Sequence, residues 1–320
     1  MIKSANPESI AEAAEILKSG GLVGMPTETV YGLAADATNG QAVAKIFAAK
    51  GRPSFNPLII HVTDLEQAGE FVVVNDWARA MSQAFWPGPL TLILPKKENT
   101  QISELASTGL ETLAVRVPAH KVARALIKAA CVPLAAPSAN ASGTLSPTTA
   151  AHVYDSLGDK VDIILAAGAC AVGLESTVLD LSGEAPLVLR PGGISAEDIS
   201  KVLGVEVRYD AGDSVAPKSP GQLLKHYAPN LPVRLNAIDL KEDEALLAFG
   251  RTKFMIGSDF PAELVCNLSE NKDLYEAAAN LFAMLKVLDE SGAKGIAVMA
   301  VPEVGIGIAI NDRLRRAAQA

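Results

Sequence analysis

Apolar and polar positions alternate along the chain with two different periods. Stretches with apolar residues three or four apart, the spacing of one helix face, are separated by short runs rich in Val, Ile and Leu. This alternation of helix-like and strand-like segments is typical of an α/β protein. The stretches that predict helices are residues 7–19, 41–50, 75–85, 270–289 and 311–318. The runs that predict strands are residues 22–25, 57–62, 90–94, 113–117, 163–165, 176–181, 187–189, 245–249, 263–266 and 295–299.

Several of these strand-like runs follow one another with no helix between them, which predicts a mixed, twisted sheet and not a purely parallel one. The regular pattern stops near residue 209 and resumes after residue 231. We therefore expect a domain over residues 1–208, a linker over 209–231 and a smaller α/β domain over 232–320. Most segments like this one, rich in Pro and Gly, are plain linkers, but a loop of this length in a compact protein is often functional. Both interpretations remain open: a linker, or a lid over an active site.

Composition and charge indicate what kind of protein this is. A chain of 320 residues with 49% apolar and 20% charged residues is that of a globular protein with room for two domains. The net charge of −8 argues against general polyanion binding. The N-terminus reads as an amphipathic helix and not as a signal peptide, and no apolar run is long enough to cross a membrane. We therefore expect a cytoplasmic protein with no membrane partner.

Two short segments carry residue types suited to phosphate. Lys50 and Arg52 place two cations next to Pro53, and Ser138 and Asn140 offer a hydroxyl and an amide at the same spacing. Arg and Lys bind phosphate through charge, while Ser and Asn donate to oxygens on which charge develops. Neither a GxxxxGK[ST] loop nor a GxGxxG loop between a strand and a helix is present. The sequence thus indicates a phosphate-handling site of a less common architecture, although Lys50 alone could be a helix C-terminal lysine.

The polar clusters follow one another at the ends of predicted strands, where α/β sheets bind their ligands. They are PTETVYGL at 26–33, KGRP at 50–53 with NPL at 56–58, SANASG at 138–143 and EST at 175–177. In order and spacing these segments closely resemble the YrdC-like L-threonylcarbamoyl-AMP synthases. The segments SPGQLLKHYAP at 219–229 and VPEVGIGIAINDRLRRAA at 301–318 resemble the long form of that family, which has an additional C-terminal domain.

This resemblance implies a twisted mixed-sheet YrdC-like domain followed by a smaller Rossmann-like α/β domain, with the linker folded over the catalytic cavity. It implies ATP-dependent synthesis of L-threonylcarbamoyl-AMP from L-threonine, bicarbonate and ATP, with release of pyrophosphate. Members need Mg2+, which we expect the ATP phosphates to hold. The product would pass to a threonylcarbamoyl transferase that modifies tRNA, so both are expected as indirect partners.

The resemblance also implies roles for individual residues. The phosphate-binding, catalytic set is Lys50, Arg52, Ser138 and Asn140. The threonine side would comprise Thr27, Thr29, Tyr31, His61, Arg116 and Ser176. The ATP side would add Asn56, Ser146, Arg190, His226 and Tyr227. We expect His61 to bind substrate and not to act as a general base, and no residue identifies the acceptor of the threonine amine proton.

Alternatives remain at this point. On their residues alone, Thr27, Thr29 and Tyr31 could serve a turn around Gly32, and His61 could be an ordinary core histidine. Two other functions also stay open: an RNA-binding module without catalysis, and a carbamoyltransferase that forms a carbamoyl adenylate. The net negative charge of the chain argues against the RNA-binding module. The second is disfavoured because the chain lacks the zinc-finger-like Cys clusters of such carbamoyltransferases. The segment 305–307 is expected to be a turn.

Overall fold

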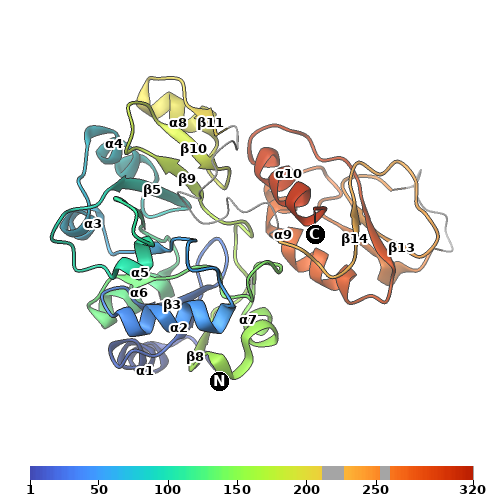
Figure 1. Cartoon of the computed structure of the whole chain (residues 1–320). Helices are drawn as coiled ribbons and strands as arrows, with labels where there is room; N and C mark the ends of the chain where they lie inside the picture. Colours follow the sequence, from blue (N-terminus) through green and yellow to red (C-terminus); the bar gives the residue numbers. More distant parts are fainter. Residues whose placement is uncertain (211–226, 253–259, 320) are drawn as a thin grey trace.

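The computed structural model describes residues 1–210, 227–252 and 260–319, and these form two units, each built around its own sheet (Figure 1). The larger sheet is mixed, with the strand order β1-β8-β2-β3-β7-β4-β6-β5-β9-β10-β11. The smaller sheet is parallel, with the order β12-β15-β13-β14. The expected fold class, a mixed-sheet unit followed by a smaller α/β unit, is therefore confirmed.

The strands of the larger sheet are short and mostly buried. They are β1 (Ile2–Ser4), β2 (Val23–Met25), β3 (Gly32–Asp36), β4 (Ile59–His61), β5 (Leu90–Pro95), β6 (Thr112–Arg116), β7 (Leu134–Ala135), β8 (Ile163–Ala166), β9 (Thr177–Asp180), β10 (Leu187–Arg190) and β11 (Arg208–Tyr209). The smaller sheet contains β12 (Val233–Arg234), β13 (Glu244–Ala248), β14 (Val265–Asn267) and β15 (Gly295–Val298). Because β4 and β6 pair in parallel, their carboxyl ends lie side by side, and both point toward the site described below.

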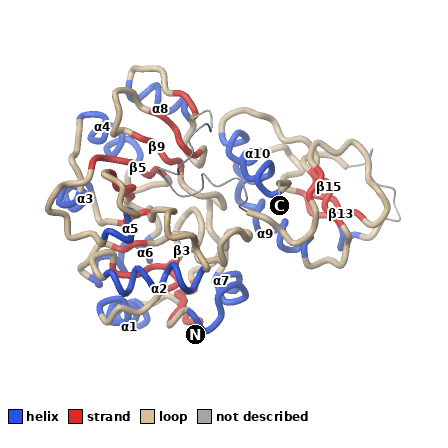
Figure 2. The backbone as a smooth tube through the Cα atoms, in the orientation of Figure 1, coloured by secondary structure: helices blue, strands red, loops and turns tan. Residues whose placement is uncertain are grey.

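The helices cover the sheets, as the blue segments of Figure 2 show. Those of the larger unit are α1 (Pro7–Lys18), α2 (Gly40–Lys50), α3 (Leu65–Phe71), α4 (Asp76–Phe85), α5 (Glu104–Ser107), α6 (Lys121–Ala130), α7 (Ala150–Leu157) and α8 (Ala196–Leu203). The smaller unit has α9 (Leu274–Asp289) and α10 (Ile306–Ala317). Most begin at an Asn, Asp, Ser or Thr whose side chain accepts from a backbone N–H of the first turn, as N-caps do.

Two expectations at the C-terminal unit need correction. The segment expected to be a turn at 305–307 is the start of α10, because Gly305 has φ 52° and acts as the N-cap while Ile306 and Gly307 are helical. A Cβ on Gly307 would lie 2.1 Å from the carbonyl oxygen of Pro302, so glycine is needed for close backbone approach and not for a turn. The strand expected at 263–266 begins at Val265, since residues Ala262–Leu264 form a 3-10 turn.

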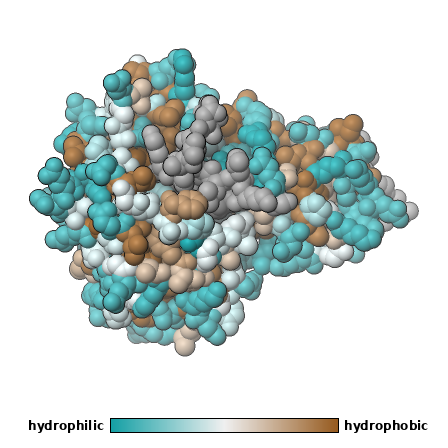
Figure 3. Space-filling view, in the orientation of Figure 1, coloured by the Kyte–Doolittle hydropathy of each residue, from teal (hydrophilic) through white to brown (hydrophobic). Residues whose placement is uncertain are grey.

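The two units meet through α9 and α10 of the smaller one, which face the larger unit in Figure 1 while β13 and β14 lie farther away. Val30 and Leu174 of the larger unit belong to the same hydrophobic cluster as Phe282 and Leu281 of α9. The described helices include none that combines the length and the apolar character needed to cross a membrane. On the face shown in Figure 3, hydrophilic residues predominate and hydrophobic ones are scattered among them.

Candidate functional site

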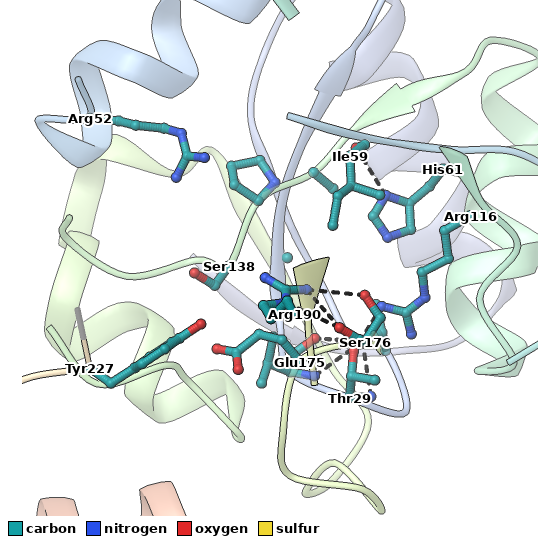
Figure 4. Close-up of a pocket in the computed structure, with 15 residues that line it drawn as sticks. Thr29, Arg52, Ile59, His61, Arg116, Ser138, Glu175, Ser176, Arg190 and Tyr227 are labelled. Carbon is teal, nitrogen blue, oxygen red and sulfur yellow. Dashed lines mark hydrogen bonds between the residues drawn. The ribbon is translucent and has the colours of Figure 1, made fainter. Parts of the chain in front are cut away.

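A pocket opens at the carboxyl ends of three strands of the larger sheet. His61, Arg116 and Arg190 are the last residues of β4, β6 and β10, and all three side chains line this pocket. Figure 4 shows His61 and Arg116 together on one side and Arg52 on the other, with Ser138, Arg190 and Glu175 between them. The pocket has a volume of about 40 Å³, close to that of one water.

Lys50 joins the two segments that sequence analysis singled out. It ends α2, where Gly51 at φ 60° redirects the chain, and its Nζ lies 2.5 Å from the carbonyl oxygens of both Ser138 and Asn140. The ammonium therefore fixes the shape of the 138–140 loop. Burial, and then the nearby Arg52, lower the pKa of Lys50 well below its ordinary value. A cation in this state gains stability when an anion binds close to it.

Arg52 presents its guanidinium to the pocket. Its Nε donates to the carbonyl oxygen of Asn56 at 3.1 Å and its Nη2 to that of Pro57 at 2.8 Å. Burial, followed by the neighbouring Arg190, lowers the pKa of Arg52 to about 9. The group is thus still charged at neutral pH, and a bound anion would oppose the shift because its charge favours the protonated guanidinium.

Arg116 is held by partners on three sides. Its Nε donates to the carbonyl oxygen of Gly88 at 3.2 Å, its Nη1 to the hydroxyl of Thr29 at 3.0 Å, and its Nη2 to Glu28 Oε1 at 2.5 Å. The hydroxyl of Thr27 lies 2.8 Å from that of Thr29, which extends the network. A guanidinium has more N–H groups than these three contacts use, so Arg116 can also bind a carboxylate in the pocket.

His61 is buried beside Arg116. Its Nδ1 lies 3.3 Å from the carbonyl oxygen of Ile59. Burial, and then the charge of Arg116, lower the pKa of His61 to about 3. The ring is therefore neutral at neutral pH and unsuited to take a proton from an ammonium group, but able to form hydrogen bonds with a ligand.

Ser176 and Arg190 form a second polar edge. Arg190 donates from Nε and Nη2 to the carbonyl oxygen of Ser176, at 3.1 and 3.0 Å, and from Nη2 to the Ser176 hydroxyl at 3.2 Å. The Ser176 hydroxyl also lies 2.7 Å from that of Thr91 on β5. The side chains of Arg190 and Ser176 are buried, and both line the pocket.

Glu175 and Arg313 are functional candidates that the sequence argument did not place in the site. Glu175 lines the pocket, accepts a hydrogen bond from Ser146 through Oε1, and pairs through Oε2 with Arg313 Nε at 3.0 Å. Arg313 comes from α10 of the smaller unit, is fully buried, and also donates to the carbonyl oxygen of Pro191 at 2.7 Å. Burial opposes its charge, but Tyr227, Glu175 and Asp312 raise the pKa of Arg313 above its ordinary value.

Tyr227 links the pocket with both helices of the smaller unit. Its ring centroid lies 5.2 Å from Arg313 Cζ and 5.5 Å from the ring of Phe282 on α9. The next residue, Ala228, donates its N–H to the carbonyl oxygen of Gly143 at 2.9 Å, which anchors the chain beside the 138–143 loop. The aromatic ring therefore forms a wall of the pocket where the two units meet.

The structure does not place every predicted site residue on the pocket. The lining residues among them are Thr27, Thr29, Arg52, His61, Arg116, Ser138, Ser176, Arg190 and Tyr227. Tyr31 points elsewhere, since its hydroxyl donates to the carbonyl oxygen of Gly168 at 2.9 Å. Lys50, Asn56, Asn140 and Ser146 are buried but do not line this pocket, and His226 is outside the described residues.

The pocket offers a ligand set for anions and not for a metal ion. In the described ranges, no group of three or more His, Cys, Asp or Glu side chains is arranged to hold a metal. The carboxylate on the pocket wall, Glu175, is already bonded to Ser146 and Arg313. These residues do not form a protein site for Mg2+.

Comparison with known proteins gives the site its context. The model of a family described as telomere recombination (Sua5, YciO and YrdC) matches residues 15–192, and that of the threonylcarbamoyl-AMP synthase C-terminal domain matches residues 194–319. Threonylcarbamoyl-AMP synthase of Pyrococcus abyssi is 42% identical, over 95% of this chain and 92% of the relative. The Bacillus subtilis protein of the same name is 39% identical, over 98% and 94%. The crystal structure of P. abyssi Sua5 complexed with L-threonine matches with a TM-score of 0.89 at 36% identity, over 100% of this chain and 96% of that one.

Proposed function

The chain belongs to the threonylcarbamoyl-AMP synthase family, and we propose that the pocket described above is where it makes L-threonylcarbamoyl-AMP. The chain is an enzyme that forms this product from L-threonine with ATP as co-substrate. We propose bicarbonate as the third substrate and pyrophosphate as the second product. We also propose that the enzyme works in the cytoplasm and that a downstream transferase delivers the threonylcarbamoyl group to tRNA.

The observation that carries this proposal is a single pocket lined by three buried arginines, Arg52, Arg116 and Arg190. Threonine brings one carboxylate and ATP brings a triphosphate, so the reaction needs cations at both ends of one site. We assign the threonine carboxylate to Arg116, because a guanidinium binds a carboxylate through paired N–H groups. Thr27, Thr29, His61 and Ser176 then surround the rest of the amino acid, while Tyr31 supports the turn from behind.

We assign the phosphates to the opposite side. Arg52 and the Ser138 hydroxyl contact them directly, Lys50 and Asn140 hold the 138–140 loop and add charge, and Arg190 lies next to the nucleotide with Ser146 and Asn56 behind. When the α-phosphorus is attacked, its bond to pyrophosphate breaks and negative charge grows on the leaving oxygens. Preorganised donors stabilise that charge because they need no reorientation at that moment.

Two further parts of the reaction are the metal ion and the acceptor of the threonine amine proton. We propose that Mg2+ reaches the site as a ligand of the ATP phosphates, where it offsets part of their charge. We also propose that a water molecule or ATP accepts the amine proton of threonine. The neutral His61 ring, whose pKa is about 3, supports its assignment to binding.

We propose the division into a catalytic domain over 1–208, a lid over 209–231 and a supporting domain over 232–320. Tyr227 on the pocket wall supports the lid, and His226 is assigned to it by its place next to Tyr227. A lid suits this chemistry because a carbamoyl adenylate reacts with water, and closing the site excludes water.

The test is pyrophosphate release from ATP and bicarbonate by the purified full chain with Mg2+, with and without L-threonine. We expect release that depends on threonine, together with an adenylate of the mass of threonylcarbamoyl-AMP. Release without threonine, or none with it, contradicts the proposal. L-Serine, which lacks one methyl group of threonine, serves as the substrate control. One methyl group in a pocket changes the free energy of selectivity by only about 1–3 kcal/mol, so serine tests how strictly the pocket requires threonine.

A further inference from the structure

The cations of the pocket differ in what balances their charge. Arg116 is paired with a carboxylate, since its Nη2 lies 2.5 Å from Glu28 Oε1. Arg52 and Lys50 donate instead to main-chain carbonyl oxygens. Within residues 1–210, 227–252 and 260–319, no carboxylate forms an ion pair with either of these two cations. Among the described residues, Arg116 therefore has a carboxylate partner and Arg52 and Lys50 do not; the carboxylate on the pocket wall, Glu175, pairs with Arg313.

Glu28 is fixed in place. Its Oε2 accepts the N–H of Ala119 at 3.0 Å, and its carbonyl oxygen accepts the N–H of Val172 at 2.8 Å. The residue is 8% exposed. Burial opposes its charge, but Arg116 and the N–H donors together hold the pKa of Glu28 below its ordinary value, so the carboxylate is ionised at neutral pH.

Two of the substrates bring an anionic group into the same pocket: threonine brings its carboxylate and ATP its triphosphate. An uncompensated guanidinium attracts a triphosphate more strongly than a carboxylate, because the triphosphate carries more charge. A carboxylate fixed against that guanidinium repels a polyanion, yet leaves other N–H groups for one carboxylate. Selectivity achieved by such repulsion is a common way to exclude the wrong ligand.

We propose that Glu28 is a specificity-determining residue that separates the binding of the two anionic groups: it keeps Arg116 for the threonine carboxylate and leaves phosphate to Arg52. Glu28 acts through Arg116 and is a positioning residue, not a catalytic one. The contacts of Arg116 to Thr29 and Gly88 do not involve Glu28, so removing its charge leaves two anchors of the guanidinium in place. This inference rests on the proposed function, which assigns threonine to Arg116.

The test is the binding of pyrophosphate and L-threonine to the full chain, measured by titration calorimetry, for the unmodified protein and for Glu28→Gln. In the unmodified protein we expect one pyrophosphate per chain and a threonine Kd that millimolar pyrophosphate leaves unchanged. In Glu28→Gln we expect a second pyrophosphate, and a threonine Kd raised about tenfold in its presence, the size expected for one charged contact. Glu12→Gln, which makes the same change in an exposed pair with Lys3, should match the unmodified protein.

The double variant Glu28→Gln/Arg116→Gln tests whether the second pyrophosphate binds because of the charge of Arg116. It replaces the ion pair with two amides of similar shape, and we expect binding of the second pyrophosphate to be lost. If Glu28→Gln is recovered unfolded, Glu28→Asp takes its place, because withdrawing the carboxylate by one methylene weakens the pairing and should raise the threonine Kd in pyrophosphate. An unchanged stoichiometry and Kd in the folded variant overturns the inference. Both readouts are binding equilibria, whereas the proposed function is tested by formation of the adenylate, so the two failures are distinguishable.

Discussion

The two units of the molecule bury charge in opposite ways. The larger unit gathers its buried cations around a cavity, where Lys50, Arg52, Arg116 and Arg190 face or support one pocket. Among the described charged residues of the smaller unit, Arg313 alone is buried, and it points out of its own core into the other unit. Buried charge is costly unless it is paired or used. We therefore propose that the chemistry lies in the larger unit and that the smaller unit contributes one buried charged residue, Arg313, to it.

The strongest test of this difference is Arg52→Ala. Removing a buried donor aimed at developing charge commonly costs a factor of about 10²–10³ in rate. We expect threonine-dependent pyrophosphate release to fall by at least about 10² while the far-UV circular dichroism stays the same. Arg208→Ala is the control, because Arg208 pairs with Glu206 on the surface. Activity within a few-fold of the unmodified enzyme would remove Arg52 from the phosphate side.

Arg313→Ala tests the smaller unit's contribution. The change leaves Glu175 buried without its guanidinium partner and removes the cation from the ring of Tyr227. Breaking one partner of a buried ion pair costs about 3–5 kcal/mol, so we expect the free energy of unfolding in urea to fall by about that much. We also expect the KM for ATP to rise, since Tyr227 would lose its support.

Arg313→Lys sharpens that result. It keeps the charge but loses the planar fork that reaches both Glu175 and the carbonyl oxygen of Pro191. We expect stability to recover in part and the KM for ATP to remain raised. Full recovery of both would mean that charge alone, and not geometry, connects the smaller unit to the pocket.

His61 gives a pH-dependent test within the larger unit. Its pKa is about 3 in the folded protein and about 6.5 in the unfolded chain, so below pH 6.5 the unfolded state binds the extra proton. Stability must therefore fall as the pH falls from about 6.5 toward 3. At pH 5 the loss due to His61 is about 2 kcal/mol. The free energy of unfolding falls between pH 7 and pH 5, and we expect this fall to be smaller by about 2 kcal/mol in His61→Gln than in the unmodified protein.

His152→Gln is the matched control for that measurement. Burial also lowers the pKa of His152, but this side chain is only half-buried, so its substitution should change the pH dependence less. Equal changes in the two variants would show that His61 is not held neutral in the way its surroundings indicate.

The sequence predicted the periodic elements and the polar segments well, for a physical reason. Lys50 and Ser138 are 88 residues apart, yet their residue types alone indicated a common anion, and the structure brings them together through a 2.5 Å contact. The place of Arg313 was not predicted, because sequence spacing cannot show which face of α10 meets another unit. Glu175 and Glu28 were missed in the same way. A carboxylate signals a role only once its partner across the fold is known.

The smallest expected effect belongs to a second ion pair between the units, which is exposed to solvent. Lys286 on α9 lies 3.4 Å from Asp155 on α7 and 2.8 Å from Glu290 of its own unit, and all three side chains are partly exposed. Exposed ion pairs contribute about 0–1 kcal/mol, because water screens them and the long side chain loses freedom. We expect Lys286→Met to change the free energy of unfolding by less than about 1 kcal/mol and to leave the KM for ATP unchanged. If Lys286→Met instead lowers the free energy of unfolding and raises the KM for ATP as much as Arg313→Ala does, the whole interface holds the units together. Arg313 would then contribute no more than an exposed ion pair.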